Sequence, residues 1–231
     1  MIINLRKTLA FTLAETLIVM GIIGVVSALT LPNLNASTGE KEKVAKVKKI
    51  YRDLNDAYGR ARAVYGPFEE WFINDSTSTA QQTRFCERLT EFMKVSKKVN
   101  NTTYILADGM QISLEGISPT SNSFHIDVDI DGPTKGKNNY GVDIFSFGTY
   151  DNVDNAQWST NSVNNSMDIK PYFGGFYDSG MMVSCGNYGG VCTRWVIDYD
   201  NMDYLKLDSN GKCPNGKALN ALANPPVVSC N

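Results

Sequence analysis

Residues 11–31 read FTLAETLIVMGIIGVVSALTL, an apolar run that carries a single charged residue, Glu15. At about 1.5 Å per residue, this run is long enough to span the hydrocarbon core of a membrane as a helix. A carboxylate inside a spanning helix costs about 2.5–3.5 kcal/mol, so an acid at this place is a candidate functional group. We therefore predict that Glu15 pairs with a positive group that this chain does not itself supply.

The residues at the start of the run indicate what that partner is. A short polar leader, residues 1–10, precedes the stretch Ala10-Phe11-Thr12-Leu13-Ala14-Glu15. This stretch closely resembles the processing site of type IV prepilins and type II secretion pseudopilins. The resemblance implies cleavage before Phe11, methylation of the new amino terminus, and pairing of Glu15 with the Phe11 ammonium of a neighbouring filament subunit. Opposite charges about 4 Å apart gain about 4 kcal/mol at an effective dielectric near 20, which offsets burial.

Two further positions carry the resemblance, and one departs from it. Gly24 and Pro32 stand where the family usually has a glycine and a helix-bending proline. The residue before the cut is usually glycine, whereas this chain has Ala10, which bears on the efficiency of cleavage.

Two other interpretations compete for the same segment. A secretory signal peptide would have a basic start, an apolar centre and a cut after small residues such as Val26-Ser27-Ala28. Its apolar centre is usually about 7–15 residues long, which is shorter than this run. A plain anchor helix explains the length but leaves Glu15 unexplained.

Charge around the run predicts the location of the chain. Arg6 and Lys7 favour a leader that stays in the cytoplasm. Lysines between Lys41 and Lys49 lie beyond the other end, but long domains are translocated largely regardless of such charge. We expect a single-pass protein of the inner (cytoplasmic) membrane with a periplasmic or extracellular head, within a cell-surface filament or a periplasmic pseudopilus.

The 231 residues, with a formal net charge of −2 and 42% hydrophobic content, leave room for one span and one globular domain. Apolar residues spaced by three and four from Val44 to Tyr65 predict an amphipathic helix that packs on a sheet, and Gly66-Pro67 ends it. We expect an α+β, pilin-like fold, in which a long N-terminal helix with a transmembrane half and an amphipathic half packs on an antiparallel β-sheet head. The predicted parts are the leader 1–10, the transmembrane and filament-core helix 11–34, its amphipathic continuation 35–66, and the globular αβ head 67–231.

Within the head, Asp108-Gly109 is a two-residue hairpin signal. Helical spacing predicts a short helix at 82–95. The predicted strands are 103–107, 110–115, 124–130, 143–150, 181–185, 192–199 and 202–207.

The five cysteines divide unevenly. Cys185 and Cys192 flank a glycine-rich stretch, a spacing that suits a bridge across a hairpin. Cys213 and Cys230 are placed to close the C-terminal loop, much as pilins often close theirs. Other pairings stay open, and Cys86 is left over in this scheme. Zinc is disfavoured because no Cys-x-x-Cys occurs in the sequence.

A short acidic repeat raises the question of calcium. Asp127, Asp129 and Asp131, followed by Gly132, match the opening of a calcium loop. The place of the closing glutamate is taken by Asn138, so we favour a polar strand edge that leads into a turn. Some secretion pseudopilins hold calcium in their heads, so the resemblance keeps a calcium site open as the alternative. No other cofactor is expected.

Catalysis finds little support, because His125 stands without a serine or cysteine motif and no Walker-type loop is present. We expect a structural subunit of a pilus or a pseudopilus, not an enzyme. The partners implied by the resemblance are other pilin-like subunits, a prepilin peptidase and methyltransferase, an assembly ATPase with its inner-membrane platform, and membrane lipid before assembly. Nothing indicates nucleic acid. The alternative is a non-polymerising, membrane-anchored or secreted extracellular domain that binds a ligand.

Overall fold

The computed structural model describes residues 12–72, 77–118, 123–149, 169–172, 191–220, 223 and 225–230, with the side chains of residues 28–38, 123 and 191 excepted. Contacts divide the chain into two compact units, Met1–Lys41 and Glu42–Asn231, and each is described by itself. The predicted strand 181–185 lies outside the described residues.

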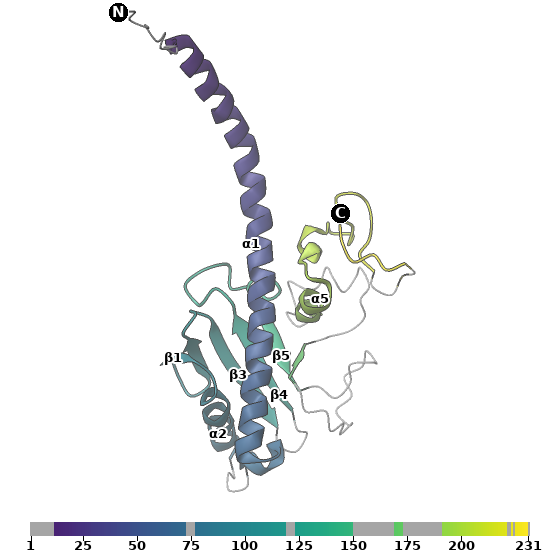
Figure 1. The fold of residues 1–231 in the computed structure, drawn as a ribbon. Helices are drawn as coiled ribbons and strands as arrows, with labels where there is room; N and C mark the ends of the chain where they lie inside the picture. Colours follow the sequence, from purple (N-terminus) through teal and green to yellow (C-terminus); the bar gives the residue numbers. More distant parts are fainter. Residues whose placement is uncertain are drawn as a thin grey trace, which may run out of the picture. The chain divides into compact units, whose positions relative to one another are not determined.

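One long helix, α1 (Leu13–Tyr65), dominates the first part of the chain (Figure 1). It ends where the sequence predicts: Gly66 adopts a φ of +79° and donates its N–H to the Arg62 carbonyl at 3.0 Å. A positive φ is easy for glycine and strained for other residues, so Gly66 stops the helix. Pro32 lies within α1, and the helix continues beyond it.

The predicted transmembrane half of this helix is wrong. A spanning helix needs about 20 consecutive, predominantly apolar residues. Among the described residues, no helix combines the length and the apolar character needed to cross a membrane. This finding corrects the fold class to an α+β fold without a transmembrane half. It also overturns the single-pass inner-membrane location.

The second unit holds an antiparallel sheet whose strands follow one another in chain order, a simple meander. Its strands in the described residues are β1 (Val95–Lys98), β2 (Thr103–Leu106), β3 (Gln111–Ser118), β4 (Ser123–Asp129), β5 (Ile144–Gly148) and β6 (Lys170–Pro171). The predicted hairpin joins β2 to β3: Gly109 has a φ of +89°, and Leu106 donates its N–H to the Met110 carbonyl at 2.8 Å. Strand β1 was not predicted from the sequence.

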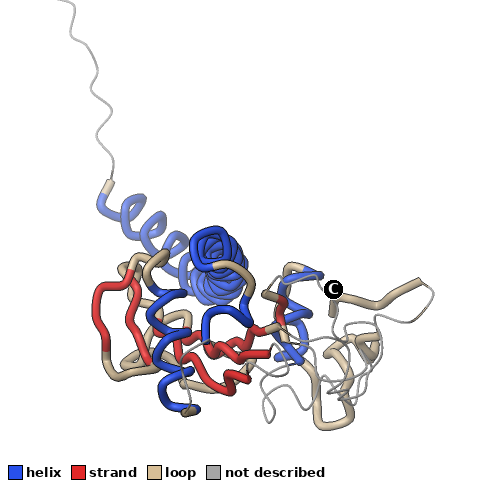
Figure 2. The backbone as a smooth tube through the Cα atoms, turned by 90° about the horizontal axis from the view of Figure 1, so that it is seen from below, coloured by secondary structure: helices blue, strands red, loops and turns tan. Residues whose placement is uncertain are grey.

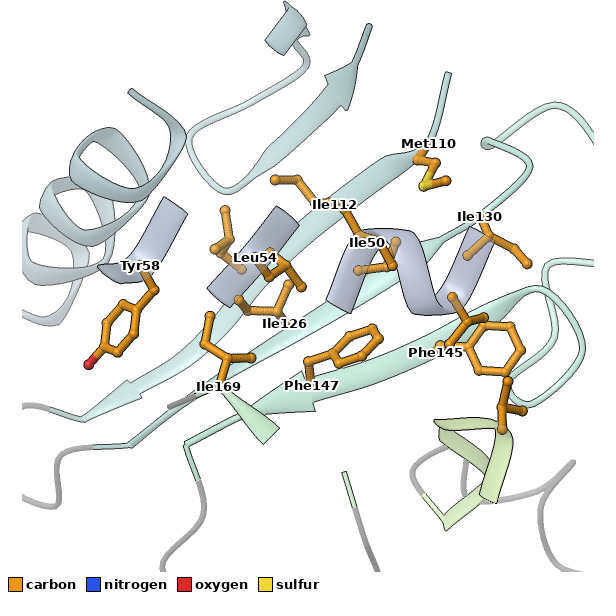
Figure 3. Packing of buried hydrophobic residues seen from close by; sticks show 14 of the residues in the cluster. Ile50, Leu54, Tyr58, Met110, Ile112, Ile126, Ile130, Phe145, Phe147 and Ile169 are labelled. Carbon is orange, nitrogen blue, oxygen red and sulfur yellow. The ribbon is translucent and has the colours of Figure 1, made fainter. Parts of the chain in front are cut away.

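The core forms where the C-terminal part of α1 packs on one face of the sheet. Figure 3 shows Ile50 and Leu54 of α1 beside Ile112 and Ile126 of the sheet, all buried completely. Fully burying each such side chain stabilises the fold by about 1.5–3 kcal/mol. The 3₁₀ helix η1 (Phe68–Phe72) and helix α2 (Ser78–Thr90) add aromatic side chains to the same core. Figure 2 shows the helices in blue and the strands in red, seen from below.

Two predicted strands near the C-terminus are wrong. Residues 192–199 belong to helix α5 (Val191–Tyr199), and Asp203–Lys206 form the 3₁₀ helix η2. The β-branched and aromatic residues of this region favour strands by composition. Cys192, Trp195 and Val196 are nevertheless buried at helical spacing, so tertiary packing overrides that preference.

Candidate functional site

An N-terminal apolar surface covers the first turns of α1. It comprises large side chains that are between 54% and 80% exposed: Leu13, Leu17, Ile18, Val19, Met20, Ile22, Ile23, Val25 and Val26. With 3.6 residues per turn, such closely spaced positions point in all directions around the helix axis, not along one face. A helix that is hydrophobic all round is normally buried on all sides. This surface is therefore a candidate assembly site.

Glu15 caps the start of this helix. Its Oε2 accepts hydrogen bonds from the Thr12 N–H and the Thr12 Oγ1, both at 2.8 Å, and its own N–H donates to Thr12 Oγ1 at 3.3 Å. This reciprocal pair is a capping box, Thr-x-x-Glu. The backbone hydrogen bond from Thr12, followed by the one from its hydroxyl, lowers the pKa of Glu15, so the carboxylate is ionised at neutral pH.

This capping role of Glu15 was not predicted from the sequence. The pattern Thr12-x-x-Glu15 before an apolar run is nevertheless typical of a capping box at the start of a helix. Ala10 and Phe11, the predicted cleavage and methylation residues, lie outside the described residues. The pairing of Glu15 with the Phe11 ammonium of a neighbour thus stays a prediction.

Two glycines, Gly21 and Gly24, interrupt the apolar surface. A Cβ added at Gly21 or at Gly24 would meet no atom within 4 Å. Glycine in a helix interior costs about 1 kcal/mol relative to alanine. The open space at these two positions would let another helix approach closely.

The second candidate is a polar groove on the sheet face that carries the outward residues of β3 and β4. Its volume is about 280 Å³. The residues that line it are Gln111, Ser113, Glu115, Asp127, Asp129, Pro133, Asn138, Tyr140 and Ile144. The strand register places Ser113 opposite Asp127, and Asp127 opposite Ser146 of β5.

Asp127 lies at the centre of a hydrogen-bond network in this groove. It accepts from His125 Nε2 at 2.9 Å, from Ser146 Oγ at 2.5 Å and from the Tyr140 hydroxyl at 2.8 Å. Burial raises the pKa of Asp127, but these bonds, led by that of His125, outweigh it and hold the pKa below its ordinary value. Burial and the bond to Asp127 raise the pKa of Tyr140 to about 12, so its hydroxyl remains a donor.

Two of the three predicted calcium ligands lie in this region and serve the chain itself, whereas the third, Asp131, has a buried Oδ1 without a hydrogen-bond partner among the described residues. Asp127 accepts the three side-chain hydrogen bonds described above. Asp129 Oδ1 accepts hydrogen bonds from the N–H groups of Asp131 and Gly132 at 3.3 and 3.0 Å. Burial and the neighbouring Asp131 raise the pKa of Asp129 to about 6. Among the described residues, no three His, Cys, Asp or Glu side chains are grouped so that they could hold a metal ion.

The groove does not have the geometry of a hydrolase triad. Ser146 Oγ donates to Asp127, not to His125, and the Ser146 side chain is buried. A nucleophilic serine needs a hydrogen bond to its base. No sequence motif pointed to a partner for His125, but its ring bonds to Asp127 and lies 5.8 Å from the ring of Tyr172.

The cysteines stabilise the C-terminal region. Cys213 and Cys230 form a disulfide with a Cα–Cα distance of 5.3 Å. Cys192 is also disulfide-bonded, whereas Cys185, the partner suggested by the sequence, lies outside the described residues. Cys86 is free and buried, and burial raises the pKa of its thiol to about 12. The disulfides are typical of an oxidising environment.

Together these features define an α+β domain in which a helix packs on an antiparallel meander and disulfides tie the C-terminal region. The chain belongs to the family of unknown function DUF6613, whose model matches residues 33–203. No curated protein and no solved structure matches the chain. The expected classification as a pilin or secretion pseudopilin is corrected to this family, whose description gives no function. The match begins after the apolar surface of α1.

Proposed function

We propose that the chain is a structural subunit of a helical filament, of the type IV pilus or type II secretion pseudopilus kind, which polymerises through the N-terminal apolar surface. The observation that carries this proposal is the exposure of nine large apolar side chains around the whole circumference of α1. The proposal includes processing of a precursor before Phe11 and N-methylation there, which the resemblance of residues 10–15 supports.

The exposed surface favours many neighbours over one. Soluble monomers rarely expose contiguous apolar patches above a few hundred Å². A dimer would cover only one side of the helix and leave the side chains of the opposite side in water. If the partner packed on the side away from Ile18 and Ile22, for example, those two side chains would stay exposed. Packing of several like helices around each copy covers all sides at once, and a filament core provides that arrangement.

The small and charged residues fit the same arrangement. Gly21 and Gly24 have open space at their Cβ positions, which lets another helix approach closely. Glu15 is ionised and lies within the apolar surface, where burial by neighbouring copies needs a positive partner. The Phe11 ammonium of an adjacent copy would be that partner after cleavage.

N-terminal mass spectrometry of the protein isolated from its own cells tests the processing step. We expect a mature chain that starts at a methylated Phe11. A chain that starts at Met1 or Leu29 contradicts the proposal.

Assembly is tested with three variants in cells, by recovery of sheared, sedimentable filaments. Glu15→Leu should be produced but not assembled, because the counter-charge of the neighbouring amino terminus is lost. Thr12→Val removes the cap and keeps the charge, so it should assemble. Asp56→Leu, an exposed acid elsewhere on α1, is the matched control and should also assemble. Normal filaments from Glu15→Leu, or none from wild type, favour the alternative of a non-polymerising extracellular binding domain.

A further inference from the structure

Beyond assembly, the polar groove has the features of a small-ligand site. We propose that it binds a neutral polyhydroxyl ligand, one ring of a carbohydrate outside the cell. The inference rests on the groove alone and holds whether or not the chain forms filaments.

The size and construction of the groove suit one small ring. Its volume of about 280 Å³ is near the lower limit of about 300 Å³ for ligand pockets. Its floor consists of the outward side chains of two paired strands, with Gln111 opposite Asp129 and Ser113 opposite Asp127. Pro133, Asn138 and Tyr140, from the segment between β4 and β5, complete the lining. A floor on paired strands is rigid, which favours binding because little is left to be ordered.

The lining offers both donors and acceptors. Three side chains can both donate and accept hydrogen bonds: the amides of Gln111 and Asn138 and the hydroxyl of Ser113. The Glu115 carboxylate only accepts them. In the described part of the chain, the side chains of Gln111 and Glu115 make no hydrogen bond. A sugar hydroxyl is itself both donor and acceptor, so it matches such a mixture, whereas a cation uses acceptors only.

An apolar element adjoins these polar groups. Tyr140 is 39% exposed, and Ile144 and Pro133 also line the groove. The Tyr140 hydroxyl is fixed by its bond to Asp127, so the ring has one orientation. A fixed aromatic ring beside a few placed polar groups is the usual construction of a small-molecule site, and it suits the C–H surface of a sugar ring.

The charges in the groove favour a neutral ligand over a cationic one. Asp127 already accepts hydrogen bonds from three side chains. Asp129 is 6% exposed and accepts from two backbone N–H groups. Only Glu115 presents an exposed carboxylate, and water screens an exposed charge.

Saturation-transfer NMR on the full chain tests the proposal, since it works on monomers and on large assemblies alike. The probes are the methyl glycosides of glucose, galactose, mannose and N-acetylglucosamine at millimolar concentration, with arginine methyl ester as the cationic probe. We expect transfer to at least one glycoside. Ser113→Tyr, which fills the groove, should abolish it, and Glu115→Ala should weaken binding at least fivefold. Glu87→Ala, which removes another exposed carboxylate, on α2 and away from the groove, should bind as the wild type does.

Three results would overturn the inference. One is the absence of transfer to every glycoside. The second is transfer to arginine methyl ester alone, which would make the groove a cation site. The third is wild-type binding by both groove variants, which would place the sugar elsewhere. Glu115 is exposed, so Glu115→Ala keeps the test valid if Ser113→Tyr fails to fold. None of these results depends on filament assembly.

Discussion

Replacing both Cys213 and Cys230 by serine should lower the free energy of unfolding by about 3 kcal/mol. The two cysteines are 17 residues apart in the sequence. In the chain-entropy model, a cross-link over that length removes about 10 cal/mol/K from the unfolded ensemble, or about 3 kcal/mol at 25 °C. For a chain of this size, we expect a fall in Tm of about 6–12 °C.

The native conformation of this loop should survive the change, because other contacts hold it. Asp203 Oδ2 accepts from the Cys230 N–H at 2.7 Å and from Ser229 Oγ at 2.8 Å. Asn215 Nδ2 donates to the Cys230 carbonyl at 2.6 Å. These bonds do not need the sulfur–sulfur link. The measured difference therefore reports mainly on the unfolded state.

Urea unfolding followed by circular dichroism, under non-reducing conditions, measures the effect. The double variant should show a lower midpoint and a larger m-value, because its unfolded chain is less constrained and exposes more surface. Wild type in reductant is a poor control, since Cys192 is also disulfide-bonded and would be reduced with it. Asp203→Asn is the better comparison because it weakens the loop contacts and keeps the disulfide. A loss below about 1 kcal/mol in the double variant would refute the entropic reasoning.

Three further predictions concern the buried side chains of Leu54, Asp129 and Cys86. Leu54→Ala, at a position of zero exposure, should cost about 2–5 kcal/mol in urea unfolding, and a loss below 1 kcal/mol would contradict the core packing. The native pKa of Asp129 is about 6 against an ordinary 3.8, so the native state holds the extra proton and this group's contribution to stability falls as pH rises between those values. Asp129→Asn should remove that slope and stabilise the protein at pH 7; an unchanged pH profile of unfolding contradicts this. Cys86 should resist a thiol reagent in the native protein and react in urea, since its thiol is buried with a pKa of about 12; rapid native labelling would show that it is accessible.

The sequence predicted correctly those turns, helix ends and strands that depend on a few neighbouring residues. Asp108-Gly109 gave the hairpin, and Gly66-Pro67 gave the end of α1. Strand β4 was predicted because its alternation reflects one buried and one solvated face. Helix α5 was missed because its residues favour strands, whereas its packing through Cys192, Trp195 and Val196 favours the helix.

The groove was beyond sequence reasoning for a different reason. Alternation along β4 places His125, Asp127 and Asp129 on one face. The contacts of Asp127 with Ser146 and Tyr140 depend on the register between β4 and β5 and on the segment that joins them. A one-residue shift in register would turn these side chains to the other face. No pattern within a single strand determines that register.

The observed capping role of Glu15 and its proposed role in assembly depend on one property, a fixed negative charge at a helix N-terminus. In the single chain, the carboxylate accepts from Thr12, completes the cap and is stabilised by the positive end of the helix dipole. When neighbouring copies cover the apolar surface, water no longer screens that charge, and a pairing that is weak in water becomes strong. A carboxylate accepts about four hydrogen bonds, so the two bonds from Thr12 leave room for an ammonium group. In the proposed filament, the cap would orient Glu15 before assembly, and the need for a counter-charge would arise only once neighbouring copies cover the apolar surface. For this reason, loss of the cap in Thr12→Val and loss of the charge in Glu15→Leu should have different consequences for assembly.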